Sequence, residues 1–260
     1  MRFFTLLSGV AFMLATFGAT AYAQQGGGNN DNLGEITFEE LKDKESGSNY
    51  FAAGGGFVGQ FALLNTNKIN DALKTYGVPG FATGSFSSPL FLSGGEGFVA
   101  VNLIKNLRVG FTGMAGTQTV TKDTLGSKSN TDLTLSLNGL NIDYAIPVFR
   151  GFTILPGLQT GWGMLRIENY GGRDTSSWTT GSDIPMKRIE ASHIYVQPHL
   201  NLEYSLTKLT MLRLSASYNA TFMGTWRENR TSTISGVPSD LTGNGLAIGF
   251  GVFVGLFNND

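Results

Sequence analysis

The chain has 260 residues, of which 14% are charged, and its 18 Lys and Arg residues nearly balance its 19 Asp and Glu residues. This balance argues against electrostatic binding to nucleic acid, and the absence of Cys excludes disulfides and thiolate-ligated metal centres. The 36 Gly residues follow no collagen period. Few charges, abundant Gly and alternating apolar segments are together typical of a transmembrane β-barrel.

The N-terminus predicts export from the cytoplasm. Arg2 precedes an apolar run over 3–17 and the sequence Ala21-Tyr22-Ala23, which together predict a signal peptide over 1–23 that is cleaved after Ala23. The apolar run is shorter than the ~20 residues of a transmembrane helix. Residues 24–47 begin with a Gly- and Asn-rich stretch and are expected to form a flexible periplasmic segment. Residues 48–260 form the predicted barrel domain.

Eight segments of the mature chain alternate between apolar and small or polar residues, as β-strands with one buried face do. The last of them places Leu246, Ile248 and Val254 on one face and small residues on the other. The segments are 49–64, 90–103, 107–120, 131–146, 152–167, 189–206, 209–227 and 244–257.

Three positions interrupt this pattern. In the fourth segment the apolar parity changes between Leu137 and Leu140, and a β-bulge at 138–139 would restore a single apolar face. Pro156 and Pro198 lie inside strands, where each removes a ladder donor, so bulges are expected there as well.

The links between the segments alternate in length. Links 104–106, 147–151 and 207–208 are short, whereas 65–89, 121–130, 168–188 and 228–243 are long and polar, with one or two helical turns expected at 69–76. Such sorting places the long loops at one end of a barrel and the short turns, with both termini, at the other. Short periplasmic turns and long extracellular loops are typical of outer-membrane barrels.

In this architecture the chain resembles the small eight-stranded outer-membrane barrels of the OmpA and OmpX type. The resemblance covers 49–257 and includes no specific motif. Gly251, Val254, Leu256 and Phe257 look like the C-terminal assembly signal of such proteins, although Asn258-Asn259-Asp260 follow. The resemblance implies a bacterial outer-membrane location, contacts with membrane lipid and lipopolysaccharide, and insertion by the outer-membrane assembly machinery.

Strand parity places the charged residues of the strands in the lumen, because a charge facing hydrocarbon is costly. An eight-stranded barrel is just wide enough for side chains to fill it, so a polar network is expected there, with a narrow proton or ion path as the alternative. A three-residue loop at 207–209 would pair Glu203 with Arg213, and one at 104–106 would pair Leu103 with Leu107. The predicted network comprises Glu96, Arg108, Asp143, His193, His199, Glu203 and Arg213.

Catalysis is not expected. The only two His residues, His193 and His199, are six positions apart on one strand, or ~20 Å, which is too far for them to share a metal. Ser192 adjoins His193 but points to the opposite face, so the two cannot form a Ser–His dyad. No catalytic residue, metal site or cofactor is therefore predicted.

Aromatic residues gather toward the long-loop ends of three strands, where an interfacial girdle is expected. The sequence therefore favours a structural or surface-interaction role, resembling adhesion, in which the long loops meet an unidentified extracellular partner. The alternatives are a narrow channel and a soluble lipocalin-like barrel with a hydrophobic ligand inside, and the second requires the apolar phase to face inward. The predicted girdle consists of Trp162, Tyr170, Tyr195, Tyr218 and Trp226.

Overall fold

The computed structural model describes residues 50–76, 85–101, 104–124, 127–173 and 186–257. The predicted signal peptide and segment 24–47 lie outside these residues. Most of the described chain forms strands, and one helix, α2 (Thr66–Tyr76), follows the first strand. The eight long strands are β1 (Ala52–Leu64), β2 (Leu90–Val101), β3 (Leu107–Thr124), β4 (Ser127–Tyr144), β6 (Phe152–Arg173), β7 (Met186–Ser205), β8 (Thr210–Met223) and β11 (Gly245–Phe257).

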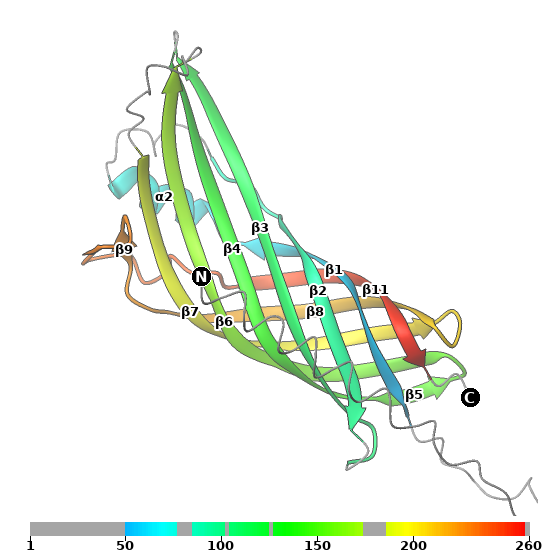
Figure 1. The fold of residues 1–260 in the computed structure, drawn as a ribbon. Helices are drawn as coiled ribbons and strands as arrows, with labels where there is room; N and C mark the ends of the chain where they lie inside the picture. Colours follow the sequence, from blue (N-terminus) through cyan, green and yellow to red (C-terminus); the bar gives the residue numbers. More distant parts are fainter. Residues whose placement is uncertain (1–49, 77–84, 102–103, 125–126, 174–185, 258–260) are drawn as a thin grey trace, which may run out of the picture. The chain divides into compact units, whose positions relative to one another are not determined.

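These strands form a closed antiparallel up-and-down barrel (Figure 1). Each long strand pairs with its neighbours in the chain, and β1 pairs with β11 to join the first strand to the last. Three short strands extend the sheet: β5 (Ile146–Phe149) pairs with β6, β9 (Arg227–Glu228) pairs with β7, and β10 (Ser232–Thr233) pairs with β9. The predicted fold class is confirmed.

The outside of the barrel is apolar. On β11 the outward residues Leu246 and Val254 are 60% and 66% exposed, whereas the inward Phe253 is fully buried. Mid-strand charges such as Glu203 and Arg213 face the lumen and are buried. A soluble calyx needs the opposite arrangement, so the lipocalin-like alternative is wrong. An apolar exterior around a polar lumen is the arrangement that a lipid bilayer requires.

The height of this apolar surface fits a bilayer. On β6 the outward residues from Phe152 to Met164 include no charge, and Arg166 is the first outward charge beyond them. Twelve residue steps at ~3.3 Å give about 40 Å along the strand. A tilt of about 40° reduces this to about 30 Å of height, close to the ~25 Å apolar band of such barrels.

The parity change in β4 marks the upper edge of this band, where "upper" means the end of the barrel away from the short turns. The pairing of β4 with β3 and β6 runs through 138–139 without a shift, so the predicted bulge is wrong. Leu140 and Ile142 face outward at 58% and 54% exposure, whereas Leu135 and Leu137 face inward and are fully buried. Below the edge lipid covers the outer face, and above it water does, so the apolar side chains change faces without any change of backbone register.

The two prolines are accommodated without bulges, and the predicted bulges are therefore wrong. Pro156 lies on β6 between the ladder to β4, which ends at Gly157, and the ladder to β5, which begins at Ile154. Its missing donor therefore falls where the partner strand is interrupted. Pro198 lies in a gap of the β7–β8 ladder, and the register is the same on both sides of that gap.

The two predicted hairpin registers had different outcomes. Glu203 lies opposite Arg213, as the three-residue loop predicts. At the other turn Val101 pairs with Leu107, so the link is two residues longer than predicted. Asn106 adopts a positive φ of 64° in that link. A shift of two residues preserves the faces of both strands, which is why parity alone could not detect it.

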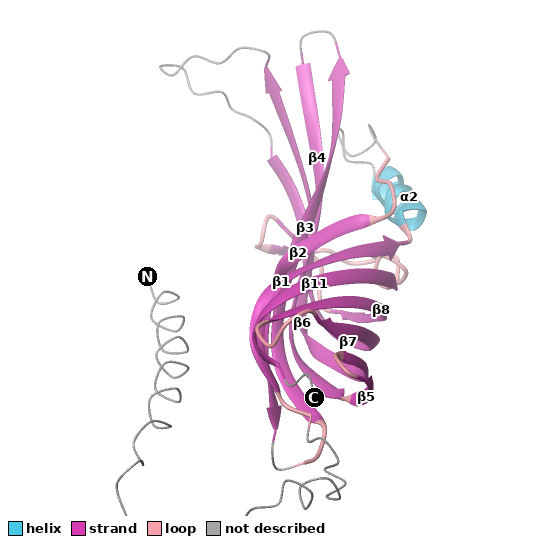
Figure 2. Ribbon diagram, turned by 90° about the vertical axis from the view of Figure 1, so that its right-hand side faces the viewer, coloured by secondary structure: helices cyan, strands magenta, loops and turns pink. Residues whose placement is uncertain are grey.

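The predicted loop 121–130 is strand in all its described residues, and the predicted loop 168–188 begins and ends in strand. β3 and β4 continue to Thr124 and Ser127, and β6 and β7 continue to Arg173 and Met186. Figure 2 shows β3 and β4, together with β6, extending well beyond the other strands. The predicted helical turns are the longer helix α2, in which the Asn65 side chain accepts a hydrogen bond from the Lys68 N–H at 3.3 Å. Within the described chain, no helix is long and apolar enough to cross a membrane.

A charge on the lipid-facing surface tests this assignment. Leu200 lies near the middle of the outward face of β7 and is 45% exposed, whereas the equally apolar Leu209 lies in the turn after β7. Leu200→Arg should lower the free energy of unfolding in lipid vesicles by about 2–4 kcal/mol. Leu209→Arg should change it little. Equal losses in urea titrations of the two variants would contradict the assignment.

Candidate functional site inside the barrel

The lower half of the lumen contains a lattice of buried charges drawn from five strands. Arg108 and Arg213 alternate with three carboxylates, and one imidazole completes the set. Every member is buried or nearly so. The residues are Glu96 on β2, Arg108 on β3, Asp143 on β4, His199 and Glu203 on β7, and Arg213 on β8. We call them the charge lattice.

Arg108 lies at the centre of the charge lattice and is fully buried. Its Nη1 donates to both oxygens of Glu203 at 2.7 and 2.9 Å, and its Nε and Nη2 donate to Asp143 Oδ2 at 3.0 and 2.7 Å. Its guanidinium carbon lies 4.3 Å from the centre of the Phe98 ring. The hydroxyl oxygen of Tyr50 lies 3.3 Å from Nη1. Arg108 therefore has partners on several sides.

Arg213 extends the same pattern across the lumen. Its Nε donates to Glu203 Oε1 at 2.7 Å, and its Nη1 donates to Glu96 Oε1 at 2.7 Å. Its guanidinium lies 4.2 Å from the centre of the Phe253 ring. Glu203 thus bridges two arginines. Removing one partner of such a buried pair leaves the other charge uncompensated, which costs about 3–5 kcal/mol.

A glycine makes room for the last contact of the lattice. Asp143 Oδ1 lies 2.5 Å from His199 Nε2, directly over Gly157 of β6. A Cβ at position 157 would overlap both atoms. The Gly-rich composition therefore has a local cause here, because large side chains can cross a narrow lumen only where another strand contributes none.

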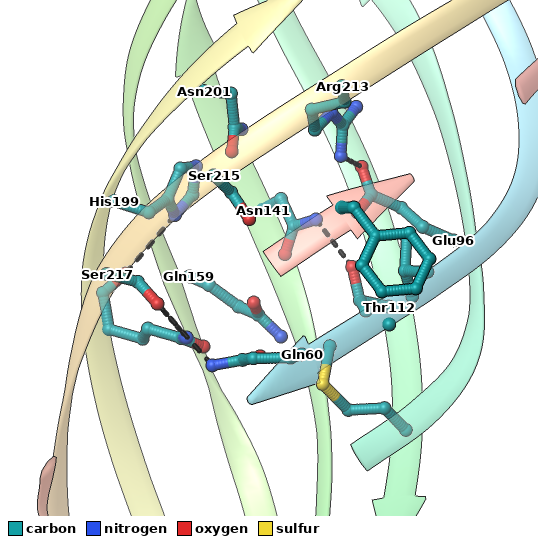
Figure 3. Close-up of a pocket in the computed structure, with 15 residues that line it drawn as sticks. Gln60, Glu96, Thr112, Asn141, Gln159, His199, Asn201, Arg213, Ser215 and Ser217 are labelled. Atoms are coloured by element: carbon teal, nitrogen blue, oxygen red, sulfur yellow. Dashed lines mark hydrogen bonds and ion pairs between the residues drawn. The ribbon is translucent and has the colours of Figure 1, made fainter. Parts of the chain in front are cut away.

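A polar chamber of about 50 Å³ adjoins the charge lattice (Figure 3). Within it Asn141 donates to Thr112 at 2.6 Å, and Gln197 donates to Ser217 at 2.7 Å. Asn141 Oδ1, Gln197 Oε1 and Arg213 Nη2 are buried without a protein partner. At about 10–15 Å³ per site the chamber has room for about three to five water molecules.

Above the chamber the lumen is dry. Leu135 and Leu137 of β4 and Leu165 of β6 are fully buried, and Leu241 and Trp226 from the segment before β11 cover them at 4% and 6% exposure. Helix α2 adds its buried residues to this core. The lumen is therefore closed by charges below and by apolar packing above.

The two predicted His positions differ in their surroundings. His199 belongs to the charge lattice, whereas both ring nitrogens of His193 are buried without a hydrogen-bond partner. His193 lies beside Tyr195, with ring centres 6.3 Å apart. Within the described residues, no group of three or more His, Cys, Asp or Glu side chains could hold a metal ion.

Two residues of the predicted aromatic girdle lie elsewhere. Tyr195 is fully buried in the lumen, where Gln159 donates to its hydroxyl at 2.5 Å, and Trp226 is 6% exposed in the apolar core. The alternation along β7 already places Tyr195 on the inner face. For this residue, alternation is a better guide to position than the clustering of aromatic residues. Trp162 and Tyr218 do face outward, at 58% and 45% exposure.

Tyr170 lies beyond the charged edge of the apolar band, and its hydroxyl donates to Asp132 at 3.1 Å. At the opposite end of the barrel, Tyr144 and Tyr204 are 48% and 47% exposed on the outer face. This lower pair was not predicted from the sequence, although outward parity next to a short turn could have identified it.

The predicted assembly residues divide between the two faces of β11. Val254 and Leu256 face outward at 66% and 58% exposure, and Phe257 is buried in the lumen beside Phe98. Gly251 also faces inward, where a Cβ would overlap the Phe253 ring. Their role in assembly remains a prediction.

An ion-pair grid lies on the outer face just above the apolar band. Arg166 Nε lies 3.2 Å from Glu190 Oε2, and Arg188 Nη1 lies 3.3 Å from Glu168 Oε1. These four residues lie opposite each other across the β6–β7 ladder. Charges at this height mark the water-exposed side of the membrane boundary.

Comparisons with known proteins give likeness of fold only. No family model matches the chain, and no curated protein matches it in sequence. A major outer membrane protein of Thermus thermophilus is 10% identical, with a TM-score of 0.46 over 79% of this chain and 99% of that one. Ail of Yersinia pestis, solved with the heparin analogue sucrose octasulfate, is 9% identical, with a TM-score of 0.37 over 80% and 97%. CarO2 of Acinetobacter baumannii is 11% identical, with a TM-score of 0.34 over 79% and 99%.

The charge lattice predicts strong coupling between Glu203 and Arg213. Each single change to Ala should lower the free energy of unfolding by about 3–5 kcal/mol. The double variant should lose clearly less than the sum, because the second change removes the charge that the first left unpaired. Urea titrations in detergent measure this coupling, with Lys208→Ala in the exposed turn as a control that changes little. Additive losses would show that the pair does not interact.

Proposed function

We propose that the chain is an outer-membrane protein of a bacterium with two membranes, and that it acts through its extracellular part. In this proposal the barrel is a closed, non-conducting anchor, and the projecting end of β3 binds an extended segment of another polypeptide by strand addition. Membrane lipid, lipopolysaccharide and the outer-membrane assembly machinery are its further expected partners. The observation that carries the proposal is the free edge of β3 above a closed lumen.

The closed lumen favours surface interaction over transport. A conducting path through this barrel would have to pass the charge lattice, where Arg108 is fully buried, and then the dry core around Leu135 and Leu165. Buried side chains fill both levels, and the chamber between them has room for only a few waters. The channel alternative is therefore not favoured.

The upper part of β3 presents an unpaired edge. Its ladder to β2 ends at Ser93 and Ala115, while its ladder to β4 continues to Thr124 and Ser127. Phe91 lies against Gly116, and Gln118 accepts a hydrogen bond from the Ser87 N–H at 3.0 Å and donates one to the Ser87 hydroxyl at 2.9 Å. Over residues 119–124, no described strand pairs with the second edge of β3. Unpaired backbone N–H and C=O groups along an extended strand are a template for another chain.

This edge carries little of the protection that edge strands usually have. Thr117, Thr119 and Thr121 form an exposed, β-branched row on one face, and Lys122 is a single basic residue near the tip. No Pro or bulge interrupts the edge, since the β3–β4 register runs without a shift to its end. Natural sheets normally block a long edge with such features, so an open one favours a binding role.

Trimming the hairpin tests the proposal. Replacing residues 120–131 by Asn-Gly leaves Thr119 opposite Asp132 and closes the strands with a tight turn. Cells that display the full chain should be retained on wells coated with collagen, fibronectin or serum protein, or should settle together in suspension. Cells that display the trimmed protein should lose this binding, while the barrel keeps its heat-modifiable migration in gels.

A matched variant separates the backbone from the side chains. Changing Thr117, Thr119 and Thr121 to Ser preserves the unpaired edge but removes the methyl groups, so strand addition should persist. Full binding by the trimmed protein would disprove the proposal. The absence of any retention or settling by cells with the full chain at the surface would do so as well.

A further inference from the structure

An apolar pocket of about 180 Å³ lies at the extracellular end of the barrel, between helix α2 and the segment 226–241. It is separate from the free edge of β3 and from the charge lattice. Its walls include Leu73 and Tyr76 of α2, Ile189 of β7, and Trp226, Val237 and Leu241 of the segment. Among the residues that the structure describes, no Lys, Arg, Asp, Glu or His side chain lines it.

The walls belong to the packed part of the molecule. Leu73, Ile189, Trp226 and Leu241 are between 3% and 6% exposed and are members of the buried core. Within the segment 226–241, the Ile234 N–H donates to the Trp226 carbonyl at 2.9 Å, which fixes the backbone on this side of the pocket. The pocket is therefore formed before any ligand arrives, which limits the entropy lost on binding.

Polar contacts also hold helix α2 against its surroundings. The Asn70 side chain donates to the Phe86 carbonyl at 3.0 Å and accepts from its N–H at 2.9 Å. At the surface Lys68 Nζ lies 2.9 Å from Asp240 Oδ2, and this hydrogen bond keeps the pKa of Asp240 below its usual range. These contacts fix the distance between the helix and the opposite wall.

The chemistry of the walls defines the class of ligand. The Thr75 hydroxyl on the pocket rim already donates to the Asp71 carbonyl at 2.9 Å, so it does not need a ligand to accept its hydrogen bond. A charged ligand would lose its hydration here without a compensating partner. An engineered apolar cavity of ~150 Å³ binds benzene, so a pocket of this size and lining suits a single aromatic ring or a short acyl chain.

We propose that this pocket binds a small, uncharged hydrophobic molecule, of the size of one aromatic ring or a short acyl chain, at the extracellular face. The inference goes beyond the strand-addition role and does not depend on it. Binding here would bury Trp226 further and would join α2 more tightly to the segment 226–241.

Quenching of tryptophan fluorescence tests the proposal. The chain has three Trp residues, and Trp162→Phe with Trp178→Phe leaves Trp226 as the only reporter. Bromobenzene is titrated as a heavy-atom quencher into this protein in lipid nanodiscs. Saturable quenching of Trp226 is expected, and benzene and toluene should compete for the site. Toluene should compete about fourfold better than benzene, since each buried carbon adds ~0.8 kcal/mol.

Filling the pocket provides the decisive comparison. Ala72→Leu adds an isopropyl group that occupies the pocket, and it should weaken bromobenzene binding at least tenfold. Asp71→Leu introduces the same side chain at an exposed position of the same helix and should not weaken binding. Val237→Phe fills the pocket from the opposite wall if the first variant fails to fold. Quenching that rises linearly without saturation, or that is equal in the filled and control variants, would overturn the proposal.

Discussion

The structure depends on the burial of Glu203 between two arginines. A narrow barrel in a membrane must direct its mid-strand charges inward, and once inside they must find partners because water is scarce. Glu203 accepts hydrogen bonds from both Arg108 and Arg213, Asp143 accepts further bonds from Arg108, and Glu96 accepts one from Arg213. These contacts join β2, β3, β4, β7 and β8 across the lumen. They also require the strands to keep one register, since a slip of one residue would turn each charge toward lipid.

The same reasoning explains why the barrel has two different interiors. Where lipid surrounds it, apolar side chains face outward and the lumen is polar. Where β3, β4, β6 and β7 rise above the membrane, water surrounds them, so Leu135 and Ile167 face inward to form a dry core. The boundary between the two regions coincides with the Arg166–Glu190 ion pair on the outer face. In both proposals this projecting end of the barrel is the part that meets other molecules, at the edge of β3 and in the pocket beside Trp226.

Sequence alone predicted the parts of this fold that depend on one-sided burial. Alternation placed Glu96, Arg108, Asp143, Glu203 and Arg213 inside, because only one face of each strand tolerates charge. It could not show that Arg108 reaches Glu203, since contacts across a lumen depend on strand stagger. Above the membrane both faces of β3 and β4 carry Thr, Ser and Asn, so the alternation fades and strand resembles loop. The expected bulge at 138–139 was wrong for a related reason: the surrounding solvent changed there while the backbone continued unbroken.

The central claim is that side chains close the lumen, and single-barrel conductance tests it most directly. Purified full-length protein is inserted into planar bilayers in concentrated potassium chloride, and the current is recorded at fixed voltages of both signs. The account predicts that inserted barrels, confirmed by their heat-modifiable migration, give no steady conductance step. A reproducible ohmic step from the unmodified protein would contradict the account, because the charge lattice and the dry core above it would then not close the lumen.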